Sequence, residues 1–222
     1  MHQRISKKIF IYLFIFFFTV TISNNKLSND FYKIKELNII GLNKLETKNL
    51  YEDIKILIDN NIFLFNKKDI SKIINSNKTV QEFNITKIYP SKLKIEIKKT
   101  NFLALTKKSG INYIVLENGN LLEKKHSSLE LPFIFGDINV KNFLFFKNLV
   151  DASNFDFKKI KNLYYFKSNR WDILTKDGII IKMPFNLTLE NLNQIFEIIK
   201  EDKFENAKII DFRQNNLMIT NE

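Results

Sequence analysis

Close to its start the chain carries an unbroken apolar run, from Ile9 to Ile22, behind a short basic head with Arg4, Lys7 and Lys8. A run of that length makes about 21 Å of helix, whereas the hydrocarbon core of a bilayer is about 30 Å thick. Counting from Ile5, with the two lysines reaching outward, extends the helix to about 27 Å. The pattern therefore predicts a membrane-targeting segment, which is either a transmembrane anchor or a signal peptide.

The residues after this run favour the anchor. A cleaved signal needs small residues before the cleaved bond, and Thr21-Ile22-Ser23 meets that requirement poorly. Lipid attachment after cleavage needs a cysteine, and the sequence has none. We therefore predict a transmembrane signal anchor over residues 9–25. The positive-inside rule then predicts a basic cytoplasmic tail over residues 1–8, with the rest of the chain outside the cytoplasm.

Between residues 30 and 100 the apolar positions alternate between strand and helix periods. Leu93, Ile95 and Ile97 alternate with lysine and glutamate, as in a strand with one buried face. Thr47 is expected to cap the first of two amphipathic helices. The expected strands are 34–40, 80–88 and 92–98, and the expected helices are 47–58 and a short one around 70–74. The order β-α-α-β-β predicts a compact α+β domain.

The pattern over residues 101–222 predicts a second, mainly antiparallel β-domain with flanking helices. Asn118-Gly119 and Asp177-Gly178 mark turns between strands. Thr188 is expected to cap a helix that places Leu192 and Ile195 on one face. The other expected elements are a helix at 140–152 and strands at 102–107, 113–116, 121–124, 163–166, 171–175, 179–183, 207–212 and 217–220.

The composition of the chain mainly argues against certain functions. The chain has 35 basic and 24 acidic residues, a net charge of +11, but the lysines are scattered without forming a basic block, so we expect no nucleic acid partner. With no cysteine, two histidines and five glycines, the sequence offers no thiol nucleophile, thiolate metal site or phosphate-binding glycine loop. We therefore expect no enzyme activity, no cofactor, no metal and no small-molecule substrate.

Two other classes of protein stay open on the residues alone. One is a periplasmic or secreted enzyme delivered by a cleaved signal, which would need a cleft with perturbed carboxylates. The other is a cationic binder of an anionic polymer such as a teichoic-type chain or nucleic acid, which would need lysines gathered on one face. Binding of the second kind would collapse at high salt.

Short motifs in order along the whole chain resemble those of one bacterial family. Leu37-Asn38-Ile39-Ile40-Gly41-Leu42 and Ile88-Tyr89-Pro90-Ser91-Lys92-Leu93 resemble the opening and closing strands of a POTRA domain. Arg170-Trp171-Asp172, continuing through Gly178 to Met183-Pro184, resembles a hairpin of the cell-division proteins FtsQ and DivIB. Ile209-Ile210-Asp211-Phe212-Arg213 resembles one of their strands. The chain thus resembles the FtsQ/DivIB family.

The resemblance implies a bitopic scaffold of the bacterial divisome that links early and late division proteins and has no chemistry of its own. It implies a single-pass type II protein of the cell inner membrane, enriched at the division septum, with its C-terminal domain in the periplasm. The implied partners are the division proteins FtsB and FtsL, bound through the β-domain. POTRA domains also occur in outer-membrane assembly. The alternative is therefore a periplasmic protein of that process, or a cationic periplasmic binding protein.

The last predicted strand is the candidate binding site for such a partner. An edge strand presents unpaired backbone groups, to which a partner segment can add a further strand. Phe212 and Met218 are the expected apolar anchors. The predicted partner-binding residues are Phe212, Arg213, Leu217, Met218, Ile219 and Thr220.

The other motif residues are expected to be structural. Trp171, the only tryptophan, is predicted to pack in the core. The motifs contain two charged pairs, Arg170 with Asp172 and Asp211 with Arg213. The members of each pair are two residues apart and would lie on the same side of a strand, as an ion pair or as loop contacts. The full structural set is Gly41, Pro90, Arg170, Trp171, Asp172, Gly178, Pro184 and Asp211.

Overall fold

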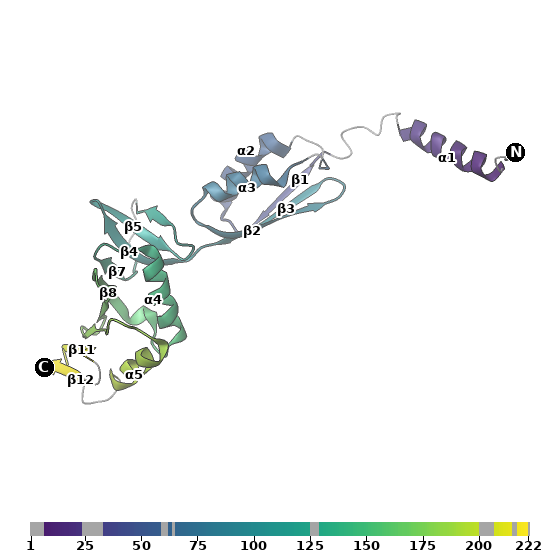
Figure 1. Cartoon of the computed structure of the whole chain (residues 1–222). Coiled ribbons are helices and arrows are strands. Elements are labelled where there is room, and N and C mark those ends of the chain that lie inside the picture. Colours follow the sequence, from purple (N-terminus) through teal and green to yellow (C-terminus); the bar gives the residue numbers. More distant parts are fainter. Residues whose placement is uncertain are drawn as a thin grey trace. The chain divides into compact units, whose positions relative to one another are not determined.

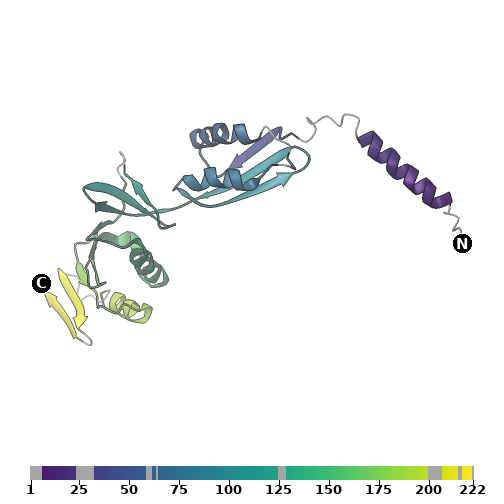
Figure 2. The same ribbon diagram turned by 45° about the horizontal axis from the view of Figure 1, so that its top comes forward.

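The computed structural model describes residues 7–23, 33–58, 62–63, 65–124, 129–199, 207–214 and 217–221 (Figure 1 and, turned, Figure 2). Most of the predicted tail, residues 24 and 25 of the predicted membrane segment, and the side chains of Leu217 and Met218 lie outside this description. The chain divides into two compact units, residues 1–77 with 82–98 and residues 78–81 with 99–222.

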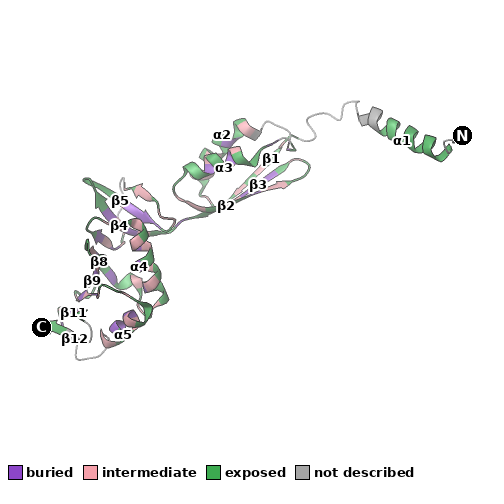
Figure 3. Cartoon of the chain, viewed as in Figure 1, coloured by how far each residue is buried: buried purple, intermediate pink, exposed green. Residues whose placement is uncertain are grey.

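The apolar run near the start forms helix α1 (Lys7–Ser23). From Ile9 to Phe18 every residue is a large apolar or aromatic one with at least half of its surface exposed, as Figure 3 shows along the described part of the helix. Over the described ranges, no helix is both long and apolar enough to cross a membrane.

The first unit packs two helices on a three-stranded sheet. Its elements are β1 (Glu36–Ile40), α2 (Lys44–Ile58), α3 (Lys67–Ser76), β2 (Val80–Ile88) and β3 (Lys92–Lys99), which confirms the predicted β-α-α-β-β order. The strand order is β1-β3-β2, with β1 parallel to β3. Ile54 and Ile70 from the helices, and Leu93 and Ile95 from β3, are fully buried. Alternation along β3 therefore buries the apolar face that the sequence indicated.

Helix α2 begins one turn earlier than predicted. The backbone N–H of Glu46 donates to Asn43 Oδ1 (2.9 Å), and the N–H of Asn43 donates to Glu46 Oε2 (3.1 Å). This reciprocal capping box satisfies backbone donors that the first turn leaves without helical partners. Thr47, the predicted cap, lies inside the helix and donates its N–H to the Asn43 carbonyl (2.9 Å). The prediction was wrong because it overlooked the Asn-x-x-Glu spacing.

The second unit is built on a nine-stranded sheet in the order β12-β11-β10-β9-β8-β7-β4-β5-β6. The pairs β4–β7, β7–β8 and β10–β11 are parallel, and the others are antiparallel. The sheet is therefore mixed, and two of its parallel pairs were missed because β7 was not predicted as a strand. The strands are β4 (Phe102–Lys108), β5 (Ile111–Leu116), β6 (Leu121–Glu123), β7 (Phe133–Phe135), β8 (Ile160–Tyr165), β9 (Trp171–Thr175), β10 (Ile180–Lys182), β11 (Ile209–Gln214) and β12 (Leu217–Asn221).

Helices α4 (Val140–Ala152) and α5 (Leu189–Ile199) bury their apolar sides against this sheet, and a short 3-10 helix, η2 (Phe157–Lys159), precedes β8. Trp171 is 6% exposed, which confirms its predicted place in the core. Its ring centroid lies 4.9 Å from that of Phe146, on α4, and 4.7 Å from that of Tyr165, on β8. The aromatic cluster therefore joins the helix layer to the sheet.

Candidate partner-binding site

Strand β12 lies at one end of the nine-stranded sheet. Its neighbour in the sheet is β11, so among the described residues its other side faces no strand. The register places Asn221 opposite Ile209, Thr220 opposite Ile210 and Ile219 opposite Asp211. Which of these backbone groups point outward depends on how β11 itself is bonded.

The adjoining parallel pair, β10 with β11, answers this question. The N–H of Ile180 donates to the carbonyl of Lys208 (2.9 Å), and Ile180 is in register with Ile209. In such a ladder Ile180 bonds to the residues on either side of Ile209, so Ile209 turns its own N–H and C=O away from β10 and toward β12. Ile210, the next residue, faces back to β10. Its opposite residue, Thr220, therefore directs its N–H and C=O to the open edge.

One face of the sheet beside this edge carries a row of four polar side chains that ends in an isoleucine. Residues directly opposite one another on paired strands project from the same face. The registers align Tyr164, Asp172, Lys182, Asp211 and Ile219 from β8 to β12. The row ends at the edge strand with Ile219, which is 55% exposed. An added strand would place its side chains beside Ile219 and next to these charges.

Two ion pairs hold the charged part of this row. Arg170 Nε donates to Asp172 Oδ1 (3.2 Å). Arg213 Nε donates to both carboxylate oxygens of Asp211 (2.9 Å each), and its Nη2 donates to Oδ2 (2.6 Å). Lys182 Nζ lies 3.9 Å from Asp211 Oδ2. Both predicted pairs, two residues apart on one side of a strand, are thus confirmed as ion pairs.

The pKa values of the two carboxyl groups are shifted in opposite directions. Burial raises the pKa of Asp172 above its ordinary value, and the nearby Arg170 opposes that rise. The hydrogen bonds from Arg213 lower the pKa of Asp211, against the smaller effect of burial. Three cations face two carboxylates in this cluster, which leaves one positive charge when both acids are ionised. The face beside β12 is therefore suited to an acidic side chain.

The other predicted contact residues are distributed between the edge and the core. Phe212 is half-buried and packs against the core, so it lies on the face opposite to Arg213. Leu217 and Met218 belong to β12 by their backbone, while their side chains lie outside the described part. The structure therefore brings Arg213, Ile219 and the backbone of Thr220 together at the edge.

The remaining motif residues lie in turns or directly after strands. Gly41 follows β1 and Gly178 lies between β9 and β10, both with positive φ. Pro90 lies in the turn from β2 to β3, and Pro184 follows β10. Lys182 was missed by sequence reasoning, because its place beside Asp211 depends on pairing with a distant strand.

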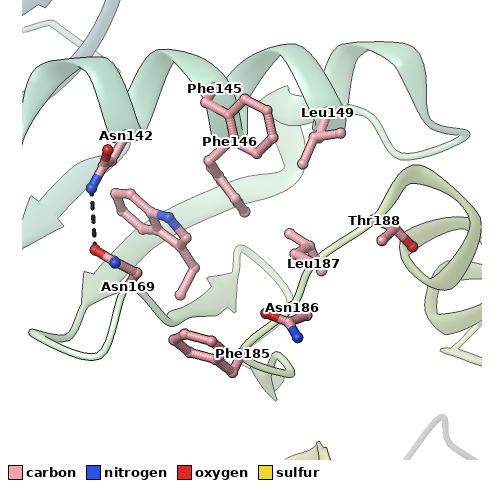
Figure 4. Close-up of a pocket in the computed structure, with 10 residues that line it drawn as sticks. Asn142, Phe145, Phe146, Leu149, Asn169, Phe185, Asn186, Leu187 and Thr188 are labelled. Atoms are coloured by element: carbon pink, nitrogen blue, oxygen red, sulfur yellow. Dashed lines mark hydrogen bonds between the residues drawn. The ribbon is translucent and has the colours of Figure 1, made fainter.

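A cavity of about 400 Å³ lies on the helix side of the second unit (Figure 4). Phe145 and Phe146 of α4, Trp171 of β9, and Phe185 and Leu187 after β10 contribute to its lining. None of the residues that line it is charged, so it offers no acid or base for catalysis. Within the described ranges, no group of histidine, aspartate and glutamate side chains is arranged to hold a metal ion.

Comparison with known protein families agrees with this architecture. Residues 32–99 match the model of the POTRA domain of FtsQ type. Residues 104–213 match the model of the C-terminal domain of the cell division protein FtsQ/DivIB. The chain is thus a POTRA-containing cell-division protein. It belongs to the FtsQ/DivIB family, as its motifs predicted.

Individual proteins similar to this chain are cell division proteins named DivIB. The cell division protein DivIB of Clostridium botulinum (strain Loch Maree / Type A3) is 27% identical, over 93% of this chain and 86% of that protein. DivIB of Bacillus subtilis (strain 168) is 23% identical, over 90% and 78% respectively. The solved major extracytoplasmic domain of DivIB from Geobacillus stearothermophilus is 14% identical, with a TM-score of 0.35, covering 46% of this chain and 92% of that one.

Proposed function

We propose that this chain is a scaffold of the division machinery that binds an extended segment of another division protein by adding it as a strand to β12. The outward direction of the Thr220 backbone groups is the observation that carries this proposal. An added strand would satisfy these groups, and main-chain pairing of this kind supplies affinity with little dependence on sequence.

Side chains would give the pairing its register. Ile219 would contact an apolar side chain on the added strand, and Arg213, whose side chain is 45% exposed, would contact an acidic one. FtsB and FtsL, the partners that the family resemblance implies, are the proposed sources of this segment. The chain itself would supply no catalytic group.

The proposed setting is the division septum at the inner membrane. Residues 9–25 would form the signal anchor, with residues 1–8 in the cytoplasm and both folded units in the periplasm. The exposed apolar side chains from Ile9 to Phe18 support this, because a helix that is apolar on all sides is stable in a lipid environment. Lys7 and Lys8 at its start agree with a cytoplasmic end.

A proline at the open edge tests strand addition. Thr220→Pro removes an outward backbone donor but leaves the bonds from β12 to β11 in place, whereas Thr220→Ala keeps the donor. The full chain in detergent would be used to capture the periplasmic segments of FtsB and FtsL. We expect capture by the wild type and by Thr220→Ala, and loss of capture by Thr220→Pro. Unchanged Trp171 fluorescence would show that the core of the second unit is intact.

Two results would contradict the proposal. One is capture by Thr220→Pro at the wild-type level, and the other is failure of the folded wild type to capture either segment. Repeating the capture across a salt series separates strand addition from binding driven by the net positive charge. Main-chain pairing should persist at high salt, whereas the binding of an anionic polymer should collapse.

A further inference from the structure

Two exposed aromatic side chains meet at one end of the first unit. Phe63, in the connection between α2 and α3, stacks on Tyr89, in the turn after β2, with ring centroids 4.8 Å apart. Both residues are 56% exposed, and Ile88, which precedes Tyr89 in the chain, is 44% exposed. A stacked aromatic pair that stays more than half exposed within its own unit is an unusual use of two large rings.

The chain enters the first unit at this same end. The N–H of Lys35 donates to the carbonyl of Ser91 (2.8 Å), and that of Glu36 donates to the same oxygen (3.3 Å). The start of β1 is thus fixed to the turn that carries Tyr89. Residues 24–34 separate Lys35 from the end of α1, and a chain of that length spans at most about 40 Å. If α1 is anchored in a bilayer, the aromatic pair stays within that reach of its surface.

The charges around the aromatic pair are mainly positive. Three lysines lie close to this turn. Two of them flank it in the chain, Lys87 and Lys92, and the third, Lys35, is bonded to it through its backbone. Lys92 pairs with Glu36 (2.6 Å), an acid at the same end, which leaves the cations in excess. Lys87 Nζ donates to the Phe65 carbonyl (2.9 Å) and so stays next to the Phe63 connection. Aromatic rings flanked by lysines are the composition found at the interface of a membrane with water.

We infer that Phe63 and Tyr89 dock the first unit on the bilayer that holds α1, with the lysines contacting anionic lipid headgroups. The inference rests on the membrane attachment proposed above, and is independent of the partner bound at β12. Docking would hold the first unit at a fixed height and orientation on the membrane. Without docking, the unit would be free to tumble relative to the membrane.

Fluorescent labels in lipid nanodiscs test this docking, and the absence of native cysteine makes single labels simple. The full chain would be reconstituted in nanodiscs of phosphatidylcholine and phosphatidylglycerol whose headgroups carry nitroxide quenchers. One label would be placed at Ser91→Cys, in the turn beside Tyr89. The other would be placed at Lys44→Cys, at the start of α2 and the opposite end of the unit. We expect strong quenching of the first label and weak quenching of the second.

Substitution of the aromatic pair separates docking from mere proximity. Phe63→Ser with Tyr89→Ser should reduce the quenching at residue 91 to the level of the label at residue 44. Leu45→Ser, which removes a 69% exposed side chain at the other end, should leave it unchanged. Because all three side chains are more than half exposed, the unit should remain folded, which circular dichroism checks.

The experiment distinguishes failure of the docking from failure of the membrane anchor. Equal quenching at the two label positions, or quenching at residue 91 that survives the double substitution, would overturn the docking while leaving the anchor in place. A chain that does not elute with the nanodiscs would overturn the proposed anchor and the docking together. Neither result bears on the capture of a partner at β12, which is measured separately.

Discussion

A matched pair of glycine substitutions tests how the second unit is packed. Gly136, after β7, and Gly178, between β9 and β10, have similar positive φ values of +104° and +92°. A Cβ at position 136 would lie 2.3 Å from the carbonyl oxygen of Tyr165, which is backbone, whereas a Cβ at position 178 would meet nothing within 4 Å. Gly136→Ala and Gly178→Ala therefore share the conformational strain but differ in the steric clash.

The two losses of stability can be estimated separately. A left-handed backbone costs a residue with a Cβ about 1–2 kcal/mol relative to glycine, and both variants bear this cost. The clash at position 136 must in addition displace β7 from β8, and overpacking of this kind costs about 1–3 kcal/mol. We therefore expect Gly178→Ala to lower the free energy of unfolding by about 1–2 kcal/mol and Gly136→Ala by about 2–5 kcal/mol.

The fluorescence of Trp171 measures these losses in the full chain. It is the only tryptophan and contacts Tyr165, so its emission during urea unfolding reports on the second unit alone. The difference in midpoint multiplied by the slope gives the difference in stability. Equal losses in the two variants, or a larger loss at Gly178, would refute the close approach of Gly136 to β8.

Two further substitutions test charge and capping. The pKa of Asp211 is lowered from its ordinary value of 3.8, so its ionised form stabilises the folded state. This stabilisation is fully present above about pH 3.8 and is lost as the pH falls through the lowered pKa. Arg213→Gln should therefore flatten the loss of urea stability on acidification from pH 5 to pH 2, and an unchanged slope would argue against the pair. Asn43→Ala should speed hydrogen exchange in the first turn of α2 by about two- to thirtyfold, the equivalent of a lost cap, while Asn49→Ala on the exposed middle of that helix should not.

Local patterns predicted most of the elements because their causes are local. The helix at 140–152 and the cap at Thr188 follow from helical spacing and from a polar residue ahead of it, and both are present in the structure. The ion pairs of Arg170 with Asp172 and of Asp211 with Arg213 were predictable for the same reason, since residues two apart on a strand share a side.

The features that could not be predicted from the sequence depend on contacts between distant segments. The three residues of β7 have no periodicity of their own and become a strand because β4 and β8 bond to them on both sides. Likewise, the row from Tyr164 to Ile219 exists only through the registers of several strand pairs. Reasoning from one sequence identified the members of the candidate site next to one another in the chain, but could not assemble Lys182 with Asp211.

An edge strand that accepts a partner must also avoid pairing with a second copy of itself. The charges beside β12 bear on that choice, because the cluster around Asp211 and Arg213 keeps one positive charge when its acids are ionised. A second copy would bring the same excess charge to the new ladder, whereas a partner strand with an acidic residue would neutralise it. Main-chain pairing through Thr220 would then supply most of the affinity, and Arg213 would supply the discrimination. On this reasoning Arg213→Gln, which brings the net charge of the cluster to zero, should weaken capture of the partner and also remove the barrier to self-association.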